Sequence, residues 1–342
     1  MPGKSIVAVD AINSIVNVLR EVDVRPVRRA AESPFVLAFF SRDLPLAQHL
    51  VDLLYRGLRE HDIPPAQVCG AFPLGAVNQP QRMQIAVVVA RDDAGNAAEQ
   101  QLAQELERAG VRVLVALVAD AAMPPHLRHQ WLPASVVTLP CGALGTLDDA
   151  LASRSLVSSI LGLKAVNELA LARHLPAFRS TVSRSLIDET ALANAVYSFG
   201  TGIAEIYPLA DIPLNVADMM VLTKNQALMS YKIALAMGLT ADFRQVMPQL
   251  AAVVGGAFLF RQAARGLIGL VPGFGLVPKV GVAFAGTYAT GEAIHRWCAY
   301  GERVTGRALR EMYDSAVVRG KTVARSLLGR YRKDRRTDIA AE

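Results

Sequence analysis

Four runs of apolar residues, separated by segments of helical spacing, constrain the fold of the N-terminal part of this chain more than any other feature. The runs occupy residues 35–40, 85–90, 111–118 and 135–139. Each run is almost continuously apolar, which is typical of strands that are buried on both faces of a sheet. Helical spacing between the runs, at 46–60 and at 97–109, predicts helices that cover those faces. We therefore expect an α/β domain with a parallel sheet over residues 34–150.

After residue 150 the strand pattern does not recur. Helical spacing is found instead in six segments, divided by proline and glycine residues: 151–177, 181–204, 214–237, 243–269, 279–300 and 302–332. We expect an all-helical domain over residues 151–301 and a basic helix and tail over 302–342. Residues 1–33 carry an amphipathic apolar stripe and then a charged linker, which predicts a helix that packs on a neighbouring domain.

The turn after the first strand lacks the residues that bind a nucleoside triphosphate. Ligands of a parallel sheet bind at the carboxyl ends of its strands, and a triphosphate needs a glycine-rich turn with a lysine there. Residues 41–48 read SRDLPLAQ, with no glycine, no lysine and a carboxylate at Asp43. The third strand runs into Ala119 and Asp120 instead of an Asn-Lys-x-Asp motif, and the GKS at 3–5 follows no strand. The sequence therefore predicts that the chain binds neither GTP nor ATP and holds no cofactor.

No arrangement of reactive side chains indicates an enzyme. The three cysteines, Cys69, Cys141 and Cys298, are far apart in the sequence and are expected to be reduced thiols of a cytoplasmic chain. His126 and His129 lie three residues apart but lack a nearby third ligand, so we expect no metal site. No Ser-His-Asp order, paired-carboxylate motif or Cys-His dyad stands out.

Two stretches of the helical half resemble a known family. They are YPLADIPLNVADMMVLTKNQALMSYKIALAMG, residues 207–238, and GGAFLFRQAARGLIGLVPGFGLVPKVGVAFAGTYATGEAIHRWCAYG, residues 255–301. Both resemble the YcjF-like, GTPase-associated helical domains, a family of unknown function that is generally taken to be membrane-associated. The segment from about 15 to 150 resembles, in its layout and in NVLREVDVRPVRRAAESPFVLAFFS, the Era-like GTPase domain that precedes such a helical domain. The resemblance implies a degenerate P-loop GTPase-like sheet, because the nucleotide-binding motifs are missing.

The segment 246–300 raises the question of membrane contact. A spanning helix needs roughly 20 largely uncharged residues, and charged residues interrupt every apolar run of this segment before that length. The residues VPGFG at 271–275 predict a turn between two helices. We expect an apolar helical hairpin whose glycines, Gly281 and Gly286 among them, face the partner helix. The hairpin either enters a membrane or is buried in a soluble bundle.

Basic residues beside this segment and along the final helix are the candidate contacts with lipid or with a protein partner. They are Arg261, Arg265, Lys279, Arg330, Arg332 and Lys333. Positive residues next to an apolar element favour the cytoplasmic face of a membrane and its anionic lipids. A solvated helix end is the alternative. Nucleic acid is not favoured, because only Tyr331 provides an aromatic ring among these charges.

Asn225 and Gln226, with Lys224, stand in an otherwise apolar, methionine-rich helix. We expect them to be either polar links within a helical bundle or a surface that contacts a partner.

These patterns favour a non-catalytic, membrane-associated scaffold or regulatory protein with a pseudo-GTPase domain, located at the cytoplasmic face of the membrane. The alternative is a soluble, partner-binding helical protein of the cytoplasm. An NTPase with a divergent pocket is a third hypothesis. The protein partner and the oligomeric state stay open.

Overall fold

The chain divides into two compact units, an α/β unit and a helical unit. The computed structural model describes residues 23–59, 69–77, 79–91, 95–119, 135–141, 147–206, 214–243, 245–246, 250, 276–302 and 304–341. The α/β unit spans Val27–Val182, and the helical unit combines Ser183–Glu342 with Met1–Pro26.

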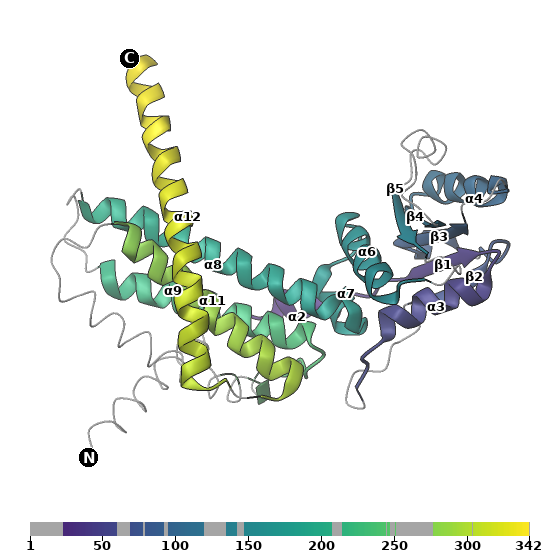
Figure 1. The fold of residues 1–342 in the computed structure, drawn as a ribbon, viewed down its shortest axis with the longest axis horizontal. Coiled ribbons are helices and arrows are strands. Elements are labelled where there is room, and N and C mark those ends of the chain that lie inside the picture. The colour runs from purple at the N-terminus through teal and green to yellow at the C-terminus, as the bar shows by residue number, and fades with distance from the viewer. Residues whose placement is uncertain are drawn as a thin grey trace. The chain divides into compact units, whose positions relative to one another are not determined.

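A five-stranded parallel sheet, with the strand order β2-β1-β3-β4-β5, forms the centre of the α/β unit (Figure 1). Its strands are β1 (Leu37–Ser41), β2 (Cys69–Pro73), β3 (Ile85–Arg91), β4 (Arg112–Ala119) and β5 (Ser135–Pro140). In the register of the sheet, Ala38 of β1 lies between Gly70 and Ala86, and Val87 of β3 pairs with Leu114 of β4. The three central strands are buried over almost their whole length, in agreement with their continuous apolar sequences.

Helices cover this sheet on both faces. The helical elements of the unit are α2 (Arg25–Ala31), the short 3-10 turn η1 (Pro80–Arg82), α3 (Leu44–Tyr55), α4 (Ala97–Arg108), α6 (Asp149–Gly162) and α7 (Glu168–His174). α3 packs on β1 and β2, α6 packs on β4 and β5, and α3 contacts α6, so these two helices share a face. α4 packs on β3 and β4, where Leu102 and Leu106 share a core with Phe40 and Val88.

The four strands that the apolar runs predict are confirmed as β1, β3, β4 and β5. The sequence analysis did not predict β2. β2 has only five residues, includes Gly70 and ends at Pro73, both of which are unfavourable in strands. It lies at the edge of the sheet and is only half-buried, with Phe72 42% exposed. An edge strand therefore lacks the continuous apolar sequence that identifies its neighbours.

All regular secondary structure described in the second unit is helical. Its helices are α8 (Pro176–Ile206), from Ser183 onward, α9 (Leu214–Ala236), α11 (Leu276–Tyr300) and α12 (Gly306–Ala341). No strand occurs in the described part of the chain after residue 150, which confirms an all-helical C-terminal region. α11 packs against α9 and, most extensively, against α12.

Glycines bring α11 and α12 unusually close. The two helices run antiparallel, since Ala293 shares a core with Leu309 while Gly281 lies against Gly320. A Cβ atom on Gly320 would lie 2.8 Å from the carbonyl oxygen and 3.0 Å from the Cα of Gly281. Gly281 therefore does lie at a close helix contact, but its neighbour there is α12. The predicted turn at 271–275 and most of the first half of the predicted hairpin, 246–300, lie outside the described residues, and its second half is α11.

Buried amides link three helices of this unit. Thr287 on α11 accepts hydrogen bonds from Asn194 Nδ2 (2.8 Å) and Gln226 Nε2 (2.9 Å) and donates one to the carbonyl of Ala283 (2.9 Å). Asn225 Nδ2 donates to Asn194 Oδ1 at 2.7 Å. Of the two roles predicted for Asn225 and Gln226, the structure assigns both residues to polar links within the bundle.

Candidate functional site

The candidate site of the α/β unit lies at the carboxyl ends of β1 and β3. From β1 the chain crosses to β2 on one side, and it then returns to β3 on the other side. In a doubly wound sheet this change of direction opens a crevice outside the carboxyl ends of the two strands, and ligands bind there. The residues that follow β1 and β3 decide what this crevice can hold.

Ser41 fixes the turn that leaves β1. Its side chain is buried, and its hydroxyl donates a hydrogen bond to the carbonyl of Val89 on β3 at 2.9 Å. The same hydroxyl accepts the backbone N–H of Asp43 at 3.1 Å. The turn is thus tied to the neighbouring strand by a side chain, and the amide of Asp43 is already bound within the turn.

Asp43 binds to the end of β3 through an ion pair. Its Oδ2 accepts from Arg91 Nη2 at 2.8 Å and from Arg91 Nε at 3.1 Å. Its Oδ1 caps α3 by accepting the N–H of Leu46 at 3.1 Å. The bond from Arg91 holds the pKa of the Asp43 carboxyl below its usual value, against the opposing effect of burial.

A second ion pair joins the same turn to α4. Arg42 Nε pairs with Glu99 Oε1, and Arg42 Nη2 donates to Asn96 Oδ1 at 3.3 Å. Asn96 Nδ2 in turn donates to the carbonyl of Arg91 at 2.8 Å. Glu99 is only 1% exposed, and its other oxygen, Oε2, has no hydrogen-bond partner in the described structure. We call Arg42, Asp43, Arg91, Asn96 and Glu99 the crevice ion-pair network.

The crevice ion-pair network places a carboxylate at the helix N-terminus where a phosphate would bind, and it leaves no unpaired arginine among its members. A phosphate at a helix N-terminus binds to free backbone N–H groups, but at α3 the Asp43 carboxylate takes that position. Both arginines at the crevice already pair with carboxylates of the protein. A triphosphate would have to displace these pairs and approach two negative charges.

The basic residues predicted to contact lipid or a partner are only partly described. Lys279 lies half-buried in the first turn of α11, and Arg330 and Lys333 are exposed near the end of α12. The side chain of Arg332 is not described, and Arg261 and Arg265 lie outside the described residues. Val277 and Val280, in the same turn of α11 as Lys279, pack with Ala324 on α12, which lies six residues before Arg330.

In the described part of the chain, no helix is both long enough and apolar enough to cross a membrane. The same residues contain no group of three His, Cys, Asp or Glu side chains that could hold a metal ion. His126 and His129 lie outside them. The three cysteines are free thiols, of which Cys298 is buried and the other two are half-buried.

No known protein family, curated protein or solved structure matches this chain. The resemblance to the YcjF-like and Era-like families therefore stays a prediction that rests on the sequence stretches quoted above.

Sequence reasoning identified Asp43 as an obstacle to phosphate but missed two ion pairs, that of Asp43 with Arg91 and that of Arg42 with Glu99. Arg91 and Glu99 lie 48 and 57 residues from the groups that they bind. One signal was available: opposite charges follow β1 and β3 directly, and parallel strands bring their carboxyl ends to the same edge. Arg42 and Asp43 after one strand and Arg91 at the end of another are sufficient to suggest an ion pair.

Proposed function

We propose that this chain is a non-catalytic scaffold or regulatory protein in which the α/β unit is a pseudo-GTPase and the helical unit mediates attachment to the cytoplasmic face of a membrane. The single observation that carries the first half is the pairing of Asp43 with Arg91 across the ends of β1 and β3. This ion pair supports the proposal because charged side chains of the protein itself occupy the crevice. In this proposal the strand order is inherited from a P-loop GTPase-like ancestor, and the sheet serves as a binding platform.

The sequence of the helical unit supports the second half of the proposal. Residues 246–291 are largely apolar and contain only three charged residues, Arg261, Arg265 and Lys279. Exposed basic residues follow on α12, and each such residue contributes about 1 kcal/mol to binding when it lies near an anionic bilayer. Because α11 is itself packed against α9 and α12, the part of this segment that would enter the bilayer in our proposal is the apolar stretch before α11, residues 251–275.

Membrane fractionation of the full chain tests attachment directly. We expect the protein to sediment with membranes and to stay there after a carbonate wash, because an inserted apolar segment is not released by removing electrostatic contacts. Release by carbonate would limit the contact to the basic surface. A protein that stays in the supernatant without any wash would contradict membrane attachment and favour the soluble partner-binding alternative.

A further inference from the structure

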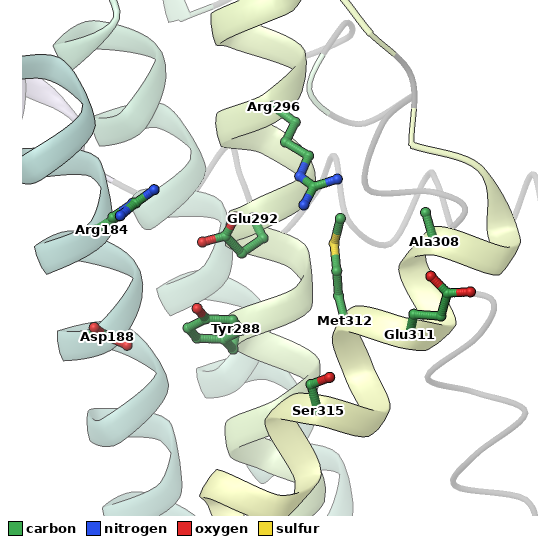
Figure 2. A pocket seen from close by; sticks show the side chains of 9 residues that line it. All are labelled: Arg184, Asp188, Tyr288, Glu292, Arg296, Ala308, Glu311, Met312 and Ser315. Carbon is green, nitrogen blue, oxygen red and sulfur yellow. The ribbon is translucent and has the colours of Figure 1, made fainter.

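Two features of the described surface stand apart from the proposed function. One is an open groove of about 650 Å³ between α8, α11 and α12 of the helical unit (Figure 2). Its charged side chains do not converge, because the Glu292 carboxylate points toward α8 while the Arg296 guanidinium points toward the start of α12. The other feature is the outer edge of the sheet at β2, where backbone groups and an exposed aromatic ring lie together.

β2 lies at the end of the sheet and, among the described strands, pairs with β1 alone (Figure 1). The backbone N–H and C=O groups on its outer side are therefore available to a further strand. Proteins commonly protect such an edge with charged side chains or with proline. Here residues 68–77 read VCGAFPLGAV, without one charged residue, and Pro73 removes only the N–H at the last position of β2. The edge is thus open to pairing over most of the strand.

An apolar side chain lies exposed at the same edge. Phe72 is 42% exposed, although its ring lies 5.9 Å from the ring of the buried Phe40. Phe40 belongs to the core between the sheet and α4, and the partly buried Leu74 and Val77 pack against that core. The apolar core on this face therefore extends to the edge of the sheet and ends there in a half-covered aromatic ring. A strand added at β2 would cover the ring from its open side.

The sequence of β2 fits a second copy of itself. Alternate side chains of a strand share a face, so Gly70 lies on the same face as Phe72. The Phe72 ring leans over Gly70, where a Cβ atom would meet ring carbons at 3.4 and 3.5 Å. When two copies of β2 are paired antiparallel about Ala71, each Phe72 lies opposite the Gly70 of the other copy. A large ring and a missing side chain then become neighbours on both sides of the two-fold axis.

The backbone at the centre of this pairing is free of the two obstacles in β2. The central hydrogen bonds use the N–H and C=O groups of residues 70–72. They need neither the N–H that Pro73 lacks nor the carbonyl of Cys69, which accepts from the Tyr55 hydroxyl at 3.3 Å.

We propose that this chain forms a homodimer in which the β2 edges of two copies pair antiparallel about Ala71, so that the two sheets become one. The paired strands have only five residues each, and so short an interface predicts a weak dimer, with a Kd of about 10 µM. The inference is independent of the pseudo-GTPase and membrane proposals, because it uses only the edge of the sheet.

Sedimentation equilibrium of the full chain in a mild detergent tests the dimer. We expect a monomer–dimer equilibrium between about 1 and 100 µM protein. Phe72→Lys adds one charge from each copy to the interface and should weaken the dimer by at least about tenfold. Leu151→Lys is the matched control. Leu151 is 37% exposed on α6, which packs on β4 and β5 toward the other end of the sheet, so its replacement should leave the equilibrium unchanged.

A cysteine at the two-fold axis tests the register without adding charge. Ala71→Cys should form a disulfide-linked dimer on mild oxidation, because the two residues at position 71 lie opposite each other with their Cα atoms about 5 Å apart. Ala76→Cys, five residues further along the chain, is the control and should not form such a dimer. This comparison decides the proposal even where Phe72→Lys perturbs the fold.

Three results would overturn the inference. A chain that stays monomeric up to about 100 µM would leave the edge to a strand from a different protein. A dimer that Phe72→Lys does not weaken would be formed by another surface. Equal cross-linking of the Ala71→Cys and Ala76→Cys variants would exclude the antiparallel pairing about Ala71.

Discussion

Asp43 and Arg91 lie at the carboxyl ends of two adjacent parallel strands, and both the Nη2 and the Nε of the arginine donate to one oxygen of the carboxylate, at 2.8 and 3.1 Å. The other carboxylate oxygen caps α3. A single side chain thus closes the crevice at which a sheet of this order binds ligands and also satisfies the amide that a bound phosphate would use. The predictions below follow from this arrangement and from the close contacts of the helical unit.

Replacing Asp43 with asparagine should lower the free energy of unfolding by about 1 kcal/mol at neutral pH, because the pair with Arg91 is partly exposed and asparagine still caps the helix. Since the folded state holds the pKa of Asp43 below its usual value, the stabilisation is complete above about pH 4 and is lost as the pH falls below that range. Urea unfolding between pH 7 and pH 2 should therefore show the parent and the variant converging in acid. Asp52→Asn, at an exposed position of α3, is the control and should show no such convergence.

Replacing Arg42 with glutamine should cost about 2 kcal/mol of unfolding free energy, because Glu99 then keeps a buried charge without its partner. Glu99→Gln in the same chain should recover part of this loss, since a buried neutral amide is easier to accommodate than a buried carboxylate. The measurement is a double-mutant cycle by urea unfolding. Strictly additive effects of the two substitutions would mean that the pair contributes nothing.

Replacing Gly320 with alanine should destabilise the helical unit by about 1–3 kcal/mol, because the new Cβ would meet the backbone of Gly281, which cannot rotate away. Gly329→Ala on the same helix has open space around the new atom and should stabilise by up to about 1 kcal/mol through helix propensity. Thermal unfolding of both variants measures the contrast. If the two variants melt alike, the close approach of α11 and α12 is wrong.

Replacing Thr287 with valine should destabilise the helical unit by about 2 kcal/mol, because the buried amides of Asn194 and Gln226 both lose their acceptor. Thr290→Val is the matched control. Thr290 is also buried on α11, but it only donates to the carbonyl of Gly286, so its loss should cost less than about 1 kcal/mol. Equal costs measured by urea unfolding would show that the amides find other acceptors.

Local sequence was sufficient to predict the central strands and the helix that is followed by Gly110, because an apolar run and a glycine after a helix are both signals within a few residues. In the structure Gly110 has the left-handed φ of 83° that such a helix end favours. β2 was missed because an exposed edge strand needs no apolar continuity. The ion pairs of the crevice could not be predicted in the same way, since Arg42 meets Glu99 only after the sheet has formed. The helix that contacts Gly281 could not be predicted either, because no local pattern identifies which helix lies against a glycine.

The central claim is that the crevice at β1 and β3 does not hold a nucleotide. Calorimetric titration of the full chain with GTP and with ATP, each with magnesium, tests it most directly. We expect no saturable heat up to about 1 mM nucleotide, and none in Asp43→Asn either, because the turn still lacks glycine and lysine. A micromolar Kd in the parent that Arg91→Gln abolishes would contradict the account, since Arg91 would then bind a phosphate as well as Asp43.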